Sequence, residues 1–382
     1  MGMPEIFAGL MSGTSLDGVD GVLIDMSGPS MSVLAHVSAP MPAALSGDML
    51  ALNSTGPNEL HRAALAANAL VRIYARVISE LLDKTGLSPT AVTAIGAHGQ
   101  TVRHQPRAFD GIGYTLQLNN PALLAELTGI DVVADFRSRD VAAGGQGAPL
   151  VPAFHQSVFG VLGETVSTLN VGGISNLTVI GPNLADDVLG FDCGPGNVLM
   201  NAWCQHHLGV PFDAEGNWAA AGNIDSGLLA VLLDDPYFMQ LAPKSTGRDL
   251  FNIDWLTHRL EGFRSVAPVD VQATLAELTA VACANDVQHY AANSQRLIVC
   301  GGGAFNAHLM SRLQIHLPLM SVQSSEAQDL PPQQVEAAAF AWLAFKALRR
   351  ESASLQSVTG AQGARILGAV YPAWPKQLNF RL

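Results

Sequence analysis

Two similar short patterns, one in each half of the chain, constrain the fold most. In the first, residues 5–10 form an apolar run, residues 11–18 are rich in glycine, serine and threonine, and residues 19–26 are apolar again. In the second, the strand-like residues 167–171 and 177–181 flank the turn Gly-Gly-Ile-Ser-Asn. β-Rich runs separated by glycine-containing turns predict hairpins. A hairpin opening each half indicates two lobes built on one plan.

The remaining patterns predict an α/β protein. Residues 58–85, 271–293 and 333–350 have apolar positions at helical spacing, whereas residues 93–102 and 296–300 begin or run as buried strands. A chain of 382 residues exceeds the size at which one core usually stops growing, so two domains are expected. A glycine-rich loop near residues 142–149 suggests the boundary, and a strand in the tail could return to the first lobe. We therefore expect one lobe of residues 1–140 plus 356–382 and another of residues 141–355.

Composition excludes several classes of function. The formal net charge is −12, so no basic field exists to attract nucleic acid or an anionic membrane. No apolar run approaches the ~18 residues of a membrane span, and no secretory leader is apparent. The four cysteines form no CxxC pair and no zinc spacing, which indicates free thiols in a reducing compartment. We expect a cytoplasmic protein whose anionic ligands are held by local groups.

Both glycine-containing turns suit a phosphate tail, because their N–H groups converge with no bulky side chain in the way. Hydroxyls of Ser12, Thr14 and Ser15 could add hydrogen bonds, and Asp17 or Asp20 could orient magnesium-bound water. An ordinary tight hairpin is an equally good interpretation of each turn. The chain has neither GxxxxGK[ST] nor a GxGxxG joining a first strand to a helix, which weakens P-loop and Rossmann interpretations.

Two carboxylates are candidates for catalysis. Asp192 is placed by its pattern at a strand end, before a Gly-Pro-Gly turn and a helix that begins near Val198. Such an aspartate could act as a general base in phosphoryl transfer, or it could cap the turn or helix. Glu336 lies in the first turn of an otherwise apolar helix, where it could position water or a sugar hydroxyl, or simply favour the helix dipole.

Other polar groups could contact a nucleotide base or a sugar. The run of three glycines from Gly301 could let an adenine or ribose lie against the backbone with Asn306 as a polar handle, or it could be a helix-entry loop. Polar residues follow two strands near residues 98 and 135, at the edge where ligands collect in α/β sheets. Arginine suits a carboxylate on the substrate. The residues that could contact the sugar are His98, Gln100, Thr101, Arg103, Asp135, Arg137 and Arg139.

Several separated blocks together resemble the anhydro-N-acetylmuramic acid kinase family. The segment 11–20, which reads Met-Ser-Gly-Thr-Ser-Leu-Asp-Gly-Val-Asp, and the string His-Gly-Gln-Thr at 98–101 look like its opening signatures. Further blocks follow the family pattern in the same order and span nearly the whole chain. These blocks are residues 131–152, 170–176, 191–197, 245–249 and 301–306.

The resemblance implies a two-lobe actin-like ATPase fold, made of duplicated ribonuclease-H-like domains with an interlobe cleft for ATP. It also implies a reaction in which water opens the 1,6-anhydro bridge while O6 accepts the γ-phosphoryl group of ATP, with Mg²⁺ as cofactor. Asp192 would activate the water, and Glu336 matches the second acidic residue. A homodimer is a family expectation. The residues expected to bind the nucleotide are Gly13, Thr14, Ser15, Leu16, Asp17, Gly18, Val19, Asp20, Gly172, Gly173, Asn176, Gly194, Gly196, Asn197, Gly301, Gly302, Gly303 and Asn306.

Two other functions fit part of the pattern. One is a kinase of the same superfamily acting on a free sugar or a carboxylic acid, which phosphate-binding hairpins alone do not exclude. The other is a nucleotide switch, in which ATP controls lobe closure for a protein partner. The sequence shows no peptide-binding domain and no filament insertion, which favours the kinase.

Overall fold

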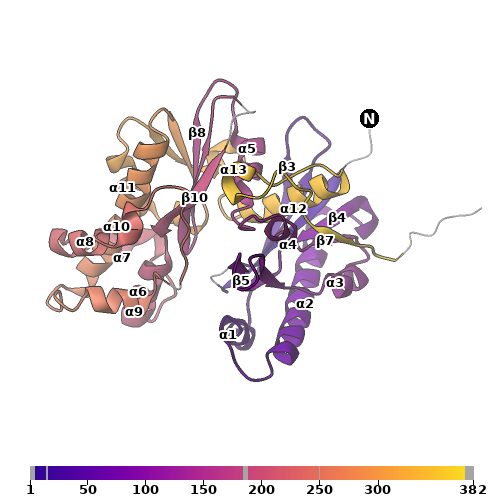
Figure 1. The fold of residues 1–382 in the computed structure, drawn as a ribbon, viewed down its shortest axis with the longest axis horizontal. Coiled ribbons are helices and arrows are strands. Elements are labelled where there is room, and N and C mark those ends of the chain that lie inside the picture. Colours follow the sequence, from indigo (N-terminus) through magenta and orange to yellow (C-terminus); the bar gives the residue numbers. More distant parts are fainter. Residues whose placement is uncertain (1–4, 14–15, 184–187, 249, 375–382) are drawn as a thin grey trace, which may run out of the picture. The chain divides into compact units, whose positions relative to one another are not determined.

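The computed structural model describes residues 5–13, 16–183, 188–248 and 250–374, and it divides into two compact units (Figure 1). The first unit comprises residues 1–154 and 334–382, and the second comprises residues 155–333. Residues 141–154 and 334–355, which the sequence analysis assigned to the second lobe, pack with the first unit. The division therefore lies after the glycine-rich loop and before the last long helix.

The first unit is built on a six-stranded sheet in the order β13-β7-β4-β1-β2-β3. β1, β2 and β3 are antiparallel neighbours, as the predicted hairpin requires, and β4 and β7 run parallel to β1. β13 pairs with β7, so the tail returns to this sheet as expected. The strands are β1 (Ile6–Met11), β2 (Gly18–Asp25), β3 (Ser32–Pro40), β4 (Val92–Ala97), β7 (Val132–Ala134) and β13 (Ala369–Tyr371).

Helices and a separate hairpin complete the first unit. The longest helix, α2 (Glu59–Thr85), buries one apolar stripe that includes Leu70 and Val77. It stops at Gly86, whose left-handed φ of 67° ends the helix where the sequence predicted. The other elements are α1 (Ala43–Ala51), α3 (Pro121–Thr128), α4 (Ser138–Ala142), α12 (Val335–Leu348), α13 (Gln356–Thr359) and the hairpin β5 (Gln100–Pro106) with β6 (Gly113–Leu118).

α12 lies against β1 and β4 at unusually short range. Gly9 and Gly96 are partners in the parallel β1–β4 ladder. A Cβ at Gly9 would lie 1.9 Å from the Ala337 carbonyl oxygen, and one at Gly96 would lie 2.0 Å from the Phe340 carbonyl oxygen. Because neither glycine has a side chain, the backbone of α12 packs directly against the backbone of β1 and β4. This close approach fixes the position of Glu336 in the first turn of α12.

The second unit repeats the plan with five strands in the order β10-β9-β8-β11-β12. β8, β9 and β10 are antiparallel neighbours, and β11 and β12 continue the sheet in parallel, just as β1, β2, β3, β4 and β7 do. This duplicated topology is that of the two-lobe actin-like ATPase fold, so the predicted fold class is confirmed. The strands are β8 (Val166–Val171), β9 (Ile174–Ile180), β10 (Leu189–Pro195), β11 (Arg296–Cys300) and β12 (Ser321–Ser324).

The second unit has its own core, centred on α10 (Pro268–Tyr290), which is buried on most sides. No helix among the described residues is both long and apolar enough to cross a membrane. No disulfide joins the four cysteines, all of which are buried. α5 (Val151–Phe159) spans the division between the units. The other helices are α6 (Val198–Leu208), α7 (Asn217–Ala220), α8 (Ser226–Leu233), α9 (Ile253–Arg259) and α11 (Ala307–His316).

Candidate active site

The turn between β1 and β2 is tied to the polar string that follows β4. Ser12 is buried, and its Oγ donates a hydrogen bond to Gln100 Oε1 at 2.5 Å. The Gly13 carbonyl accepts from the Leu16 amide at 3.2 Å, which closes the turn. Thr14 and Ser15 lie outside the described residues. Two sequence-predicted groups, the phosphate turn and the sugar-binding string, are therefore in direct contact.

The two acidic residues predicted to orient magnesium-bound water differ in their surroundings. Asp17 is exposed at the end of the turn. Asp20 lies on β2, where its Oδ1 accepts a hydrogen bond from Ser38 Oγ and lies 3.1 Å from His36 Nε2. No group of three or more potential metal ligands occurs among the described residues, so the assignment of Asp17 and Asp20 to Mg²⁺ stays a prediction. Gly18 and Val19 form the start of β2.

The buried His98 and the half-buried Arg137 form a pair just after the ends of β4 and β7. Arg137 Nε and Nη2 lie 3.1 and 2.9 Å from His98 Nε2, and Nη1 donates to the Gly147 carbonyl at 2.9 Å. Because both guanidinium nitrogens are donors, Nε2 accepts and the imidazole proton belongs on Nδ1. Burial, and then the Arg137 charge, lower the pKa of His98 to about 3. His98 is therefore neutral at physiological pH.

Glu336 belongs to the same cluster in the first unit. Burial lowers the pKa of Arg137 to about 10, while the charges of Glu336 and Asp140 act in the opposite direction. A guanidinium at this position suits a carboxylate ligand. The structure thus brings together His98, Arg137 and Glu336, all three of which the sequence analysis selected.

The other residues predicted to contact the sugar make their contacts outside the cluster of His98, Arg137 and Glu336. Thr101 Oγ1 accepts from Gln117 Nε2 at 3.3 Å, and Asp135 is an exposed residue with a φ of 59°. Arg103 donates to the Leu52 carbonyl at 3.0 Å and pairs with Glu59 at 3.2 Å, so its guanidinium serves a structural contact. Arg139 lies exposed on α4.

Asp192 is held by several groups of the second unit. It lies within β10, at an irregularity in the pairing with β9 between Asp192 and Gly194, and not at the strand end that the sequence predicted. Its Oδ2 accepts from Ser245 Oγ at 2.9 Å and from the Thr246 amide at 3.0 Å. These contacts differ from the turn or helix cap that was the alternative interpretation. The strand runs on to Pro195 because the bulge lets the chain continue pairing past the aspartate.

The backbone of Asp192 is fixed as well. Its amide donates to the Lys244 carbonyl at 3.0 Å, and its carbonyl accepts from the Tyr237 hydroxyl at 2.7 Å. Burial raises the pKa of the Asp192 carboxyl, opposed by the Thr246 amide, the Ser245 hydroxyl and the Lys244 charge. A carboxylate with a raised pKa, gripped on one oxygen, is suited to accept a proton. The sequence analysis did not assign Tyr237, Lys244, Ser245 or Thr246 to the site, although residues 245–249 stood out as a block.

Glycine turns meet at the ends of β8, β9 and β10. The Gly173 carbonyl accepts from the Gly196 amide at 2.9 Å, and the Gly172 carbonyl accepts from the Asn197 amide at 2.8 Å. A Cβ at Gly196 would lie 2.4 Å from the Gly172 carbonyl oxygen, so only glycine fits there. Asn176 pairs with Asp192 across β9 and β10. These contacts bring together the predicted residues Gly172, Gly173, Asn176, Gly194, Gly196 and Asn197.

The third glycine segment follows β11. Gly301 has a φ of 77°, and a Cβ there would lie 2.3 Å from Asn170 Oδ1. Gly302 and Gly303 form a short 3₁₀ turn, and Asn306 Oδ1 caps α11 by accepting from the Leu309 amide at 2.9 Å. The helix-entry interpretation therefore describes its local structure, and the nucleotide contacts stay a prediction.

Known proteins resemble this chain along nearly its whole length. The sequence model of the family described as anhydro-N-acetylmuramic acid kinase matches residues 5–373. A protein of Albidiferax ferrireducens named anhydro-N-acetylmuramic acid kinase is 66% identical, over 97% of this chain and 100% of that protein. One of the same name from Variovorax paradoxus is 62% identical, over 97% and 99%. A solved ROK family glucokinase from Streptomyces griseus, in complex with glucose and AMPPNP, aligns over 88% of this chain and 98% of its own with 14% identity and a TM-score of 0.42.

Proposed function

Since the chain belongs to the anhydro-N-acetylmuramic acid kinase family, we propose that it uses ATP to phosphorylate 1,6-anhydro-N-acetylmuramic acid during peptidoglycan recycling. The observation that carries this proposal is 66% identity over 97% of the chain to a relative bearing that name. The products are N-acetylmuramic acid 6-phosphate and ADP. Because the anhydro sugar has no free 6-hydroxyl, the acceptor oxygen must be made during the reaction.

The proposed reaction couples hydrolysis to phosphoryl transfer. Water attacks C1, a C1–O bond forms, and the C1–O6 bond of the bridge breaks. O6 then forms a bond to the γ-phosphorus of ATP as the bond between that phosphorus and the β,γ-bridging oxygen breaks, and ADP leaves. The proton of the attacking water passes to Asp192, which is supported in this role by its raised pKa and by the grip on Oδ2.

We propose that residues of the first unit bind the sugar. The neutral His98 accepts from Arg137 through Nε2 and so orients the guanidinium, which can face the carboxylate of the lactyl group. Glu336 would orient water or a hydroxyl. Gln100, Thr101 and Asp135 complete the proposed contacts, of which Gln100 is the best supported because it bonds to Ser12.

ATP is assigned to the glycine turns. Backbone N–H groups of the turn that begins at Gly13 and of Gly172 and Gly173 would hold phosphates. The turn at 194–197 would support Gly172 and Gly173, because the amides of Gly196 and Asn197 donate to their carbonyls, and residues 301–306 would contact the nucleoside. Mg²⁺ would neutralise charge on the transferred phosphoryl group, with Asp17 as its exposed carboxylate partner. A cytoplasmic homodimer is the form in which we expect the enzyme to act.

The test is to incubate the purified protein with ATP, Mg²⁺ and anhydro-N-acetylmuramic acid in oxygen-18 water. We expect ADP and a phosphorylated sugar carrying one heavy oxygen at C1, measured by mass spectrometry. Unlabelled product would contradict water attack at C1. Phosphorylation of free N-acetylmuramic acid or glucose in preference to the anhydro sugar would favour the rival assignment, a kinase for free sugars.

A further inference from the structure

A buried ion pair between Lys244 and Asp286 lies next to Asp192, because the Lys244 backbone is hydrogen-bonded to the Asp192 amide. Lys244 Nζ is 3.1 and 3.2 Å from the two carboxylate oxygens of Asp286 on α10, and the Lys244 side chain is only 2% exposed. The same ammonium lies 5.3 Å from the centroid of the Tyr237 ring and 5.7 Å from that of Phe191. Lysine is rarely this buried without a specific partner, because its charge loses its hydration.

The segment anchored by this pair is the one that grips Asp192. The Lys244 carbonyl accepts the Asp192 amide at 3.0 Å, and the next two residues, Ser245 and Thr246, both donate to Oδ2. No described residue donates a hydrogen bond to Oδ1. One carboxylate oxygen is therefore fixed, and the other is left to accept a proton.

We propose that Lys244 and Asp286 are positioning residues for Asp192: their ion pair locks residues 244–246 in place, and the ammonium stabilises the ionised form of the carboxylate. This inference rests on the proposed function, because it concerns the base of that reaction. A buried ion pair is seldom needed for stability, since apolar residues of similar volume are often as stable. A role in positioning Asp192 would explain why the chain keeps this pair although burying two charges costs free energy of desolvation.

Few other charges act on Asp192 from its surroundings. Burial raises the pKa of Tyr237 and of Cys193, so both are neutral at physiological pH. Cys283 lies beside Cys193, and His289 acts on Asp286 from α10. Lys244 is the one cation among the described residues that lowers the pKa of Asp192. Removing its charge is therefore expected to change the titration of Asp192 itself.

The test uses Lys244→Met in the full chain, with ATP and the anhydro sugar as substrates. We expect kcat to fall about 100-fold, as misplacement of a catalytic group commonly causes. The KM for ATP should stay within about twofold, since the base is not needed to bind nucleotide. The acidic limb of the kcat profile should move to higher pH, because the carboxylate without its neighbouring cation binds a proton more tightly. A purely structural role would not move that limb.

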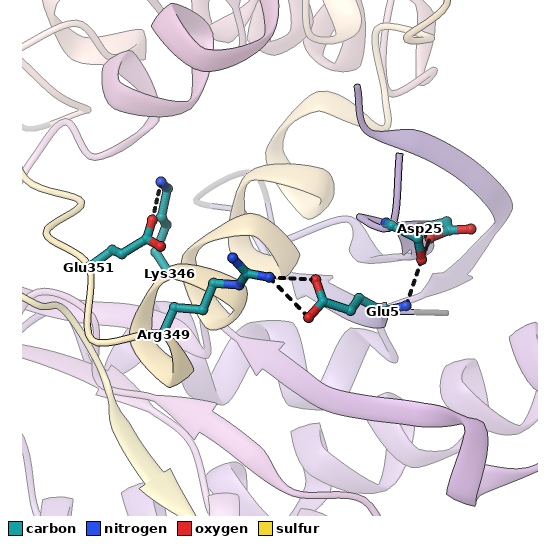
Figure 2. A network of polar contacts seen from close by, with 6 residues as sticks. Glu5, Asp25, Lys346, Arg349 and Glu351 are labelled. Carbon is teal, nitrogen blue, oxygen red and sulfur yellow. Dashed lines mark hydrogen bonds and ion pairs between the residues drawn. The ribbon is translucent and has the colours of Figure 1, made fainter. Parts of the chain in front are cut away.

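Two further variants keep the test decisive. Lys244→Met/Asp286→Leu replaces the pair with apolar side chains, should fold, and should show the same loss of kcat and the same shift. Lys346→Met is the matched control, because Lys346 pairs with Glu351 at 2.6 Å (Figure 2). It also lies 5.4 Å from the centroid of the Trp342 ring, but it belongs to the first unit. It should keep the wild-type kcat and pH profile.

The outcomes separate this inference from the proposed function. Wild-type kcat and an unmoved acidic limb in a folded Lys244 variant would overturn the positioning role while leaving the reaction intact. Unfolding of the double variant would assign the pair to stability and would overturn it too. Failure of the wild-type protein to phosphorylate the anhydro sugar would instead reject the proposed function. Full activity of Asp192→Asn would leave that function standing and would overturn both the role of Asp192 as the base and the positioning role of the pair.

Discussion

Asp192 is the residue whose replacement should affect turnover most. Asp192→Asn keeps the shape and leaves an amide oxygen to accept from Ser245 and Thr246, but it removes the proton acceptor. We expect kcat to fall about 1,000-fold, within the usual range for loss of a general base. ATP affinity, measured by calorimetry, should not change. Retained formation of sugar phosphate would remove Asp192 from the mechanism.

His155 gives a prediction about stability against pH. Its ring is fully buried, its Nδ1 lies 3.0 Å from Thr178 Oγ1, and burial lowers its pKa to about 3. Below pH 6.5 the unfolded chain binds a proton that the folded chain does not, so stability falls as the pH drops from 6.5 toward 3. In His155→Gln, the loss of unfolding free energy between pH 7 and pH 5 should be smaller by about 2 kcal/mol.

Urea titrations at pH 7 and pH 5 measure this difference. His258→Gln is the control, because it makes the same substitution at a side chain that is 78% exposed on α9. An equal loss of stability in wild type and His155→Gln would show that the buried imidazole does not resist protonation.

At the residue scale, the sequence pointed to candidate site residues more readily than to the residues that hold them in place. His98 and Arg137 could be selected because they follow apolar strands, and Glu336 because it is an acidic residue in the first turn of an otherwise apolar helix. The structure places the three together. Lys244 and Tyr237 could not be selected, because their link to Asp192 crosses more than 40 residues of chain and leaves no periodic signal. The bulge at Asp192 was also missed, since it depends on pairing with β9.

Among the elements, α12 depends on the two glycines beneath it. Gly96→Ala would place a Cβ 2.0 Å from the Phe340 carbonyl oxygen, so the helix must move away from β4. We expect a loss of about 3 kcal/mol in unfolding free energy, at the upper end of the usual cost of overpacking. Glu336 would move with the helix, so kcat should fall as well. Chemical denaturation and steady-state kinetics measure the two effects.

Gly47→Ala is the matched control for that substitution. Gly47 lies within α1, and a Cβ there would meet nothing within 4 Å. Alanine is the better helix former, so this variant should gain roughly 0.5–1 kcal/mol. Equal stability of the two variants would show that the contact between β4 and α12 tolerates a side chain at position 96.

Elements were predictable where the signal is local. Helix α2 ends at Gly86 and strand β11 covers residues 296–300, both as their patterns indicated, because capping and apolar runs act over a few residues. The contact of α12 with β1 and β4 was not predictable, since the glycines and the helix are more than 200 residues apart.

For the whole molecule, the repeated plan could be predicted from two hairpins, but the division between the units could not. The glycine-rich loop at 142–149 is a strong local signal, yet residues 141–154 pack with the first unit, where Gly147 accepts from Arg137 and donates to Asp140. Long-range contacts therefore outweighed the composition of the loop. Helix α12 likewise belongs to the first unit because its partners β1 and β4 do.

The chain order of the two units leads to a prediction about fragments. Residues 155–333 are continuous and contain their own sheet and core, so this fragment should fold alone, with helical circular dichroism and one cooperative unfolding transition. Residues 1–154 should not, because they lack α12, which covers β1 and β4, and β13, which pairs with β7. A fragment of residues 1–154 that unfolds cooperatively would show that α12 is dispensable for the first core, whereas an unfolded 155–333 fragment would show that the second core needs the first.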